Sequence, residues 1–429
     1  GKGLRLRDDF WGEESRVSQA ENDGLALTFS TQEIDEALSS MKTETAPGPD
    51  GRPVIFFRRF WPALKDTFYD IINGFALGTV DISRLNYGVI SLIPRVKGAD
   101  TIKQYRPITL INVPFKICSK AYTTRLASVA QRVIDRSQSG FLKGRNILEG
   151  PVVMQEIVHE LKRTRHPSVL FKLDFEKAYD KVNWNFLLNC HKMREFHPQW
   201  TEWVRKILVE GTVSVKLNDE VGPYFQSSKG VRQGDPFSPF LFNFAADCLT
   251  KMVTKAQQNG LFKGLASDLI PNGVAILQYA DDTLLLFEPD LHSIASVKAI
   301  LLCFEIMSGL KINFHKSTLI PMNCDANLSQ DIAQIFGCKI GKMPFTYLDL
   351  PLGTSKPSVQ DLMPIVCNME RRLTSTLSMM SYGSKLSLLN TVITSLTIFA
   401  LCTLRFPAKI LELLDKLRRK CLWTKNRAR

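Results

Sequence analysis

The chain has 429 residues, of which 45% are hydrophobic and 23% charged, with 55 basic against 42 acidic side chains. This length exceeds one compact core and indicates roughly two to four subdomains, while the composition excludes a disordered or fibrous protein. The formal net charge of +13 favours a polyanionic partner such as nucleic acid, although a positive charge can also serve solubility alone.

Cysteine usage and hydropathy narrow the class of protein further. Nine cysteines without a Cys-x-x-Cys pair indicate a reduced intracellular protein, not a disulfide scaffold or a zinc finger. The uncharged stretch 386–404 has about the length of a membrane span. Seven of its nineteen residues are Ser, Thr or Asn, which favours a buried or groove-lining helix, so no membrane association is predicted.

The predicted elements mix helices and strands and end in a helical region beyond about residue 356. The expected helices, in chain order, are 31–43, 58–76, 114–134, 150–163, 183–190, 198–209, 239–257 and 291–309. The expected strands are 88–95, 108–112, 169–173, 211–217, 222–228, a hairpin over 274–288, and an extended segment at 311–321. This mixture predicts an α+β fold.

Two adjacent carboxylates, Asp281 and Asp282, stand at the apex of the predicted hairpin. A turn between two apolar strands leaves its side chains at the rim of a sheet. An isolated Asp-Asp pair most often makes only a polar turn. With no dense His or Cys cluster nearby, a metal bound by this pair would be Mg²⁺ or Mn²⁺ in preference to zinc.

A third carboxylate, Asp174, ends the apolar run 169–173. Taken alone, Asp174 is well explained as the cap of the helix that follows. Beside a hairpin that carries two more aspartates, it would complete the three-carboxylate cradle of a two-metal phosphoryl transfer. The backbone carbonyl of Phe175 could add another hard oxygen ligand.

Eight ordered motifs resemble those of reverse transcriptases of non-LTR (LINE-type) retrotransposons, and the chain looks most like plant elements of that family. Four of them are Leu173-Asp-Phe-Glu-Lys-Ala-Tyr-Asp180, Gly230-Val-Arg-Gln-Gly-Asp-Pro-Phe-Ser-Pro239, Tyr279-Ala-Asp-Asp282 and Gly309-Leu-Lys-Ile-Asn-Phe-His-Lys-Ser317. The others are Ala46-Pro-Gly-Pro-Asp-Gly51, Tyr105-Arg-Pro-Ile-Thr-Leu110, Gln138-Ser-Gly-Phe-Leu-Lys-Gly-Arg145 and Tyr347-Leu-Asp-Leu-Pro-Leu-Gly353. The resemblance covers the chain from about residue 25 onward.

The resemblance implies a right-hand polymerase fold with a ferredoxin-like antiparallel palm sheet and a helical thumb. The expected divisions are an N-terminal extension (1–45), fingers with helices leading to the palm (46–168), a first part of the palm (169–210), a strand pair on the fingers side (211–229), a second part of the palm (230–355), and a thumb with a basic tail (356–429). The chain opens on Gly1, so we expect a piece of a longer protein, without the endonuclease and Cys/His modules of a full-length element.

The implied activity is RNA-directed DNA polymerisation in target-primed reverse transcription, with two ions of Mg²⁺ or Mn²⁺. Asp174 and Asp281 would share the ions, with Asp282 beside them. Lys316 would stand near the outgoing pyrophosphate, where it could donate a proton or only bind phosphate. The alternatives are an RNA-directed RNA polymerase and a non-catalytic or maturase-like nucleic-acid binder.

The resemblance also implies nucleotide contacts, with Phe175 among them. Tyr179 would exclude a ribose 2′-hydroxyl by its size, although an ordinary core tyrosine is the alternative. Gln233 and Gly234 would face the nascent base pair. Their neighbours Arg232 and Asp235 could instead form a local salt bridge. Cations for the triphosphate are expected at Arg106 and Lys97, the second of which is equally well explained as a solvated lysine.

The primer end would rest on a grip formed by Leu350, Pro351, Leu352 and Gly353. Asp349 stands in the preceding turn where relatives usually have Gly, and Asp tolerates a positive φ less well than Gly does. The implied partners are an RNA template, a DNA primer or target, and deoxynucleoside triphosphates. A ribonucleoprotein in the nucleus and cytoplasm is the expected location, and no oligomeric state is predicted.

Overall fold

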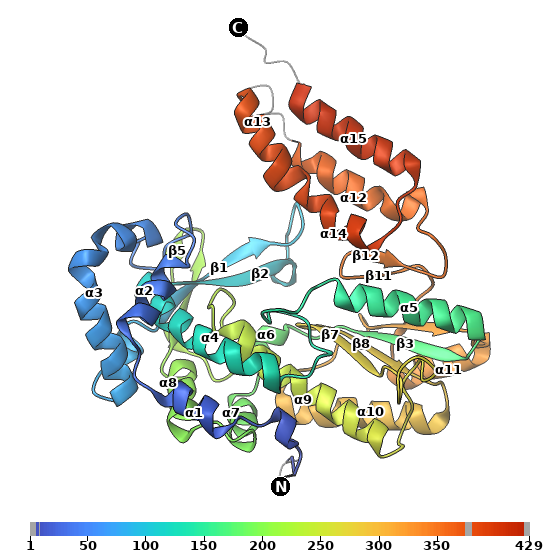
Figure 1. The fold of residues 1–429 in the computed structure, drawn as a ribbon, viewed down its shortest axis with the longest axis horizontal. Coiled ribbons are helices and arrows are strands. Elements are labelled where there is room, and N and C mark those ends of the chain that lie inside the picture. Colours follow the sequence, from blue (N-terminus) through green and yellow to red (C-terminus); the bar gives the residue numbers. More distant parts are fainter. Residues whose placement is uncertain (1–5, 8, 374–379, 424–429) are drawn as a thin grey trace. The chain divides into compact units, whose positions relative to one another are not determined.

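The computed structural model describes residues 6–7, 9–373 and 380–423 (Figure 1). The ends of the predicted N-terminal extension and of the predicted basic tail, 1–5 and 424–429, lie outside the described residues. The chain divides into two compact units. The first unit comprises Gly1–Arg145, Asp174–Leu261 and Ala295–Asn313, and the second comprises Asn146–Leu173, Phe262–Ile294 and Phe314–Arg429.

A five-stranded sheet organises the first unit. Its strands are β1 (Tyr87–Pro94), β2 (Tyr105–Ile111), β4 (Thr212–Leu217), β5 (Glu220–Val221) and β6 (Phe225–Gln226). The central strand β1 pairs antiparallel with β2 and parallel with β4. The continuous strand predicted at 222–228 is wrong, because within that range the structure has only the short strand β6, which residues 222–224, with Pro223 among them, separate from β5. Proline has no N–H to donate to a strand ladder, which accounts for the interruption.

The helices of the first unit include α1 (Gln19–Ala26), α2 (Thr31–Ser39), α3 (Val54–Leu77), α4 (Val113–Val133), α6 (Ala178–Lys181), α7 (Trp184–Met193), α8 (Pro198–Val209) and α9 (Ser238–Gln258). Among them, α1, α2, α3 and α9 pack against α4. The helix α1 was not predicted, and α3 begins four residues before the expected start. Serines at the N-caps of α1 and α2, Ser18 and Ser30, form capping boxes with the glutamates three residues later. These boxes satisfy backbone N–H groups that a short helix would otherwise leave unpaired.

A second five-stranded sheet organises the second unit, in the order β10-β9-β3-β8-β7. The bounds are β3 (Ser168–Leu173), β7 (Ile276–Tyr279), β8 (Asp282–Phe287), β9 (Thr318–Met322) and β10 (Lys339–Ile340). The strand β3 lies between β8 and β9 and is antiparallel to both. The extended segment predicted at 311–321 is thus a strand only from Thr318.

Alternate residues of this sheet point to opposite faces, as the strand period requires. On one face Leu170, Leu284 and Ile320 share a hydrophobic core with α5 (Glu149–Thr164). On the other face Phe171 and Phe287 contact the ring of Phe336 in α11 (Ala326–Phe336). Figure 1 shows α5 and α11 on the two sides of these strands. The sequence did not predict α11.

The C-terminal region is helical, as predicted. It contains α12 (Val359–Arg372), α13 (Tyr382–Leu388), α14 (Ser395–Thr403) and α15 (Ala408–Trp423), which pack side by side (Figure 1). A π-helical turn (Leu389–Ile393) joins α13 to α14. By length and composition alone, Tyr382–Thr403 and the helix α10 (Leu291–Ser308) could each cross a membrane. Core helices of globular proteins meet the same criteria, so these two helices are weak evidence of a membrane protein.

Candidate active site

The turn between β7 and β8 presents the Asp281-Asp282 pair. Tyr279 pairs with Asp282, which leaves Ala280 and Asp281 as a two-residue turn. Ala280 has a φ of 54°, a left-handed conformation that costs a residue with a Cβ about 1–2 kcal/mol. Hairpin turns of this kind normally use glycine there, and backbone strain gathers at functional sites. The side chain of Asp281 is exposed and that of Asp282 half-buried.

The pairing of β3 with β8 brings the end of β3 to this turn. Leu173, the last residue of β3, lies opposite Thr283, the second residue of β8. Asp174 follows Leu173 in the chain, and Asp282 precedes Thr283. In the part of the chain that the structure describes, no group of three or more His, Cys, Asp or Glu residues is arranged to hold a metal ion. The three-carboxylate cradle therefore stays a prediction.

The backbone beyond β3 is held by the segment 311–313. The carbonyl oxygen of Asp174 accepts a hydrogen bond from the Asn313 N–H at 2.7 Å, and the Glu176 N–H donates to the Lys311 carbonyl at 2.8 Å. Because strand residues alternate in direction, the carbonyl of Phe175 points away from this segment. The Phe175 carbonyl can therefore serve as the predicted oxygen ligand, a role that stays a prediction.

Tyr179 is half-buried and its ring stacks on Phe242 of α9. The ring centroids are 4.8 Å apart and the planes differ by 7°. Phe242 is fully buried, so it forms a rigid support for the tyrosine ring. This geometry accommodates both sequence-based interpretations, because the ring contacts the core and yet keeps an exposed side.

The loop 230–239 places Gln233 and Gly234 against β2. The carbonyl of Gln233 accepts a hydrogen bond from the Thr109 N–H at 2.7 Å. Gly234 has a φ of 113°, and a Cβ atom at this position would come within 2.7 Å of the Thr109 carbonyl oxygen. Only glycine fits there. Gly234 is exposed and Gln233 half-buried, so both remain accessible at the loop surface.

Arg232 and Asp235 hold this loop from within. Their predicted salt bridge is confirmed, with 3.6 Å between Nη2 and Oδ2. Asp235 also accepts hydrogen bonds from the Phe237 N–H at 3.0 Å and from the hydroxyl of Ser119. The Arg232 guanidinium lies 4.8 Å from the ring centroid of Phe115, and burial lowers the pKa of Arg232. Arg232 and Asp235 therefore stabilise the loop.

The predicted cations are exposed on both units. Arg106 lies on β2 opposite Ile93, and Lys97 lies in the connection from β1 to β2. Lys316 lies in the second unit, two residues before β9. The first unit thus carries the predicted nucleotide contacts, and the second unit carries Asp281, Asp282, Lys316 and the predicted primer grip.

The predicted primer grip is a hairpin of β11 (Phe345–Tyr347) and β12 (Leu350–Leu352). Its two turn residues, Leu348 and Asp349, have φ values of 48° and 62°. The turn therefore requires the left-handed conformation for which glycine is favoured. The Lys172 ammonium donates a hydrogen bond to the Thr346 carbonyl at 2.8 Å, which ties the hairpin to β3. Burial raises the pKa of Tyr347, and the negative charge of Asp282 raises it further.

Asp180 is a candidate functional residue that the sequence did not single out, although it closes the first motif. Its Oδ1 atom accepts a hydrogen bond from Nε2 of Gln233 at 3.2 Å. Burial raises the pKa of Asp180, while the hydrogen bond and the positive charges of Lys177 and Arg95 lower it. The only sequence signal was the position of Asp180 beside Tyr179.

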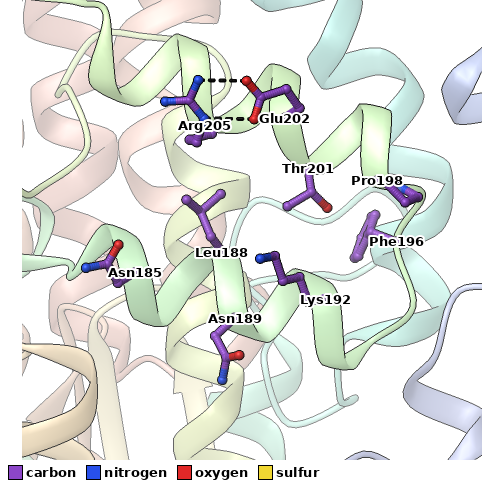
Figure 2. Close-up of a pocket in the computed structure, with 9 residues that line it drawn as sticks. All are labelled: Asn185, Leu188, Asn189, Lys192, Phe196, Pro198, Thr201, Glu202 and Arg205. Atoms are coloured by element: carbon purple, nitrogen blue, oxygen red, sulfur yellow. Dashed lines mark hydrogen bonds and ion pairs between the residues drawn. The ribbon is translucent and has the colours of Figure 1, made fainter.

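Two pockets lie within the first unit. One, of about 310 Å³, is lined by residues of the loop 230–239 together with Thr109, Lys177 and Asp180. The other, of about 720 Å³, lies between α7 and α8 (Figure 2). Its described lining residues are Asn185, Leu188, Asn189, Lys192, Phe196, Pro198, Thr201, Glu202 and Arg205, none of them a predicted site residue.

A family model for reverse transcriptases (RNA-dependent DNA polymerases) matches residues 95–350, and the chain belongs to this family. It has the right-hand polymerase fold of that family. The relatives identify it further as the reverse transcriptase domain of a non-LTR retrotransposon.

The transposon TX1 uncharacterized 149 kDa protein of Xenopus laevis is 28% identical over 72% of this chain and 23% of its own length. The retrovirus-related Pol polyprotein from type-1 retrotransposable element R2 of Nasonia vitripennis is 23% identical over 63% of this chain and 25% of its own length. The corresponding polyprotein of Popillia japonica is 24% identical over 68% of this chain and 39% of its own length. This chain therefore spans well under half the length of these relatives. A solved apo telomerase from Candida tropicalis, truncated from its C-terminal domain, aligns at a TM-score of 0.42 with 13% identity, covering 57% of this chain and 51% of that chain.

Proposed function

We propose that this domain is an RNA-directed DNA polymerase that adds deoxynucleotides to a primer 3′-hydroxyl during target-primed reverse transcription. Family membership over 95–350 supports the reaction class. The observation that carries the proposal is the register of β3 and β8, in which Leu173 lies opposite Thr283. Each of these two residues adjoins, along the chain, an aspartate that the motifs single out: Asp174 follows Leu173, and Asp282 precedes Thr283.

Two divalent ions, Mg²⁺ or Mn²⁺, would be held by Asp174, Asp281 and Asp282 with the carbonyl of Phe175. An all-oxygen donor set of this kind suits hard cations. When bound, such a pair of ions stabilises the attacking and leaving oxygens of an in-line displacement. The strained turn at Ala280 supports this assignment, because it keeps Asp281 exposed at the end of an otherwise buried hairpin.

The remaining roles are those that the sequence motifs imply. Tyr179, supported by Phe242, would exclude a ribose 2′-hydroxyl. The loop with Gln233 and Gly234 would face the incoming nucleotide, and Arg106 with Lys97 would bind its phosphates. Lys316 would bind the outgoing pyrophosphate. The hairpin that ends in Leu350, Pro351, Leu352 and Gly353 would support the primer end.

The proposed partners are an RNA template, a DNA primer or target, and deoxynucleoside triphosphates, within a ribonucleoprotein of the nucleus and cytoplasm. The net charge of +13 supports a polyanionic partner. The predicted likeness to plant elements rests on the sequence motifs, and the animal relatives do not support it.

The proposal is tested by extension of a DNA primer on an RNA template with Mg²⁺, comparing deoxynucleotides with ribonucleotides. Asp281→Ala is expected to abolish extension, whereas Asp268→Ala, an exposed carboxylate in a turn of the same unit, is expected to leave it unchanged. Extension by Asp281→Ala within a few-fold of the parent would reject the metal site. Extension that uses ribonucleotides instead would identify an RNA polymerase, and template binding without extension a non-catalytic binder.

A further inference from the structure

We infer that Asp180 is a positioning residue for nucleotide binding, because its carboxylate determines which end of the Gln233 side-chain amide faces the nucleotide. The inference rests on the proposed role of Gln233. Asp180 lies in α6 and is half-buried, and its Oδ1 atom is 3.2 Å from Nε2 of Gln233. The two residues are 53 positions apart in the chain.

The chemistry of the two groups sets the direction of this hydrogen bond. An ionised carboxylate can only accept, so Gln233 must turn its NH₂ group toward Asp180. The amide oxygen Oε1 is then directed away from Asp180. The second N–H of Nε2 can donate another hydrogen bond. Without a partner of fixed polarity, the two ends of a glutamine amide would exchange at little cost.

Backbone hydrogen bonds hold both residues in place. The Val231 N–H donates to the Tyr179 carbonyl at 2.7 Å, and the Gly230 N–H donates to the Val182 carbonyl at 2.8 Å. The Gln233 carbonyl is held in turn by the Thr109 N–H. The side chain of Gln233 is thus oriented before a nucleotide arrives, which reduces the ordering cost of binding.

Opposing effects act on the Asp180 carboxyl group. Burial raises the pKa of Asp180 above its ordinary value, and the hydrogen bond from Gln233 with the positive charges of Lys177 and Arg95 limits that rise. Asp180, Gln233 and Lys177 all line the pocket of about 310 Å³. The pair therefore borders open space, unlike a pair enclosed in the core.

The segment also provides a matched control. Glu176 lies four residues before Asp180 and pairs with Lys181 at 2.7 Å and with Lys311 at 4.0 Å. Both lysines lie outside the loop 230–239. Neutralising Glu176 removes the same charge from the same segment and leaves the Asp180–Gln233 hydrogen bond in place.

The experiment is single-nucleotide incorporation by the whole chain. Asp180→Asn offers Gln233 either a donor or an acceptor, so the amide can adopt both orientations. We expect KM for the deoxynucleotide to rise about tenfold with kcat within about threefold, the effect of one lost charge-assisted hydrogen bond. Glu176→Gln should leave both constants unchanged.

The double variant distinguishes positioning from a general structural role. If Asp180 acts through Gln233, Asp180→Asn combined with Gln233→Ala should raise KM no more than Gln233→Ala does alone. Additive effects, or an unchanged KM in Asp180→Asn, would overturn the inference. A second measurement is the affinity of each variant for dTTP, obtained from the rise in unfolding temperature that dTTP causes. If the parent extends no primer, the proposed function fails. If Asp180→Asn binds dTTP as tightly as the parent does, only the role of Asp180 is overturned. A dTTP affinity about tenfold weaker in Asp180→Asn supports that role.

Discussion

The ring of Tyr179 lies almost flat on the ring of Phe242, with 4.8 Å between their centroids. Phe242 is fully buried in α9, so the tyrosine cannot move back without displacing core residues. A size filter requires this rigidity, because a mobile ring would yield to a larger substrate. The contact therefore gives the proposed gate a physical basis that the sequence did not contain.

Shortening Tyr179 should weaken discrimination against ribonucleotides. We expect Tyr179→Ala to lower the preference for deoxynucleotides by at least about tenfold, because the excluded volume disappears. Tyr179→Phe keeps the ring and its stack on Phe242 and should keep the preference. The ratio of kcat/KM for matched deoxy- and ribonucleotides measures the effect. An alanine variant that still refuses ribonucleotides would assign Tyr179 to the core alone.

Asp349→Gly should stabilise the domain. Asp349 has a φ of 62°, and glycine adopts this conformation without the penalty of a Cβ, which predicts a gain of about 0.5–1 kcal/mol. Loss of the carboxylate also removes repulsion toward primer phosphates, so primer binding should tighten at low salt. Chemical denaturation and primer titration measure the two effects. Asp268→Gly, in a turn without a positive φ, should show no gain.

Acid should destabilise the domain through His191. Burial lowers the pKa of His191 to about 4, and its Nδ1 donates to the Leu187 carbonyl at 2.9 Å. The unfolded chain binds this proton near pH 6.5, so stability is lost as the pH falls from about 6.5 to about 4, by roughly 3 kcal/mol in total.

The measurement is the free energy of unfolding in urea at pH 7 and at pH 5. His191→Leu should reduce the difference between the two pH values, whereas His292→Gln, at an exposed histidine, should leave it unchanged. Paired carboxylates such as Glu21, whose pKa Arg132 holds at about 2, contribute equally to the pH dependence of the parent and of both variants. Equal pH dependence in His191→Leu and the parent would exclude His191 as the source.

The buried pair of Arg194 and Asp247 should tolerate joint replacement better than single replacement. Both side chains are fully buried and hydrogen-bonded to one another. Burial raises the pKa of Asp247, and the Arg194 guanidinium, which lies 3.7 Å from the ring centroid of Trp11, opposes that rise.

Asp247→Ala leaves a buried guanidinium without its counter-charge, at a cost of about 3–5 kcal/mol. Adding Arg194→Met should recover at least half of this loss, as measured by denaturation. Glu202→Ala, which breaks the exposed pair with Arg205, should cost less than about 1 kcal/mol. If the double variant is less stable than Asp247→Ala, the uncompensated charge is not the main cost.

Long periodic segments were predictable because their apolar faces repeat at the helical period. The helix predicted at 198–209 matches α8, and α4 and α9 differ from prediction by one residue at each end. The helices α1 and α11 were missed because they are short and take their stability from packing against the rest of a unit. The short strands β10, β11 and β12 were missed as well. The strand expected at 222–228 failed because a proline interrupts its ladder.

The candidate site residues could be named before the fold was known. Asp174, Asp281 and Asp282 stand at the ends of apolar runs that a local period can locate, whereas Tyr179 was named by the resemblance of its motif. The sequence also placed Asp349 in a turn.

The contacts between distant residues could not be predicted. The fold sets Leu173 opposite Thr283, the ring of Tyr179 on Phe242, and Gln233 beside Asp180. It also gave Leu348 and Asp349 their positive φ values. Periodicity shows which face of an element is buried, whereas strand register and side-chain partners depend on contacts between segments far apart in the chain.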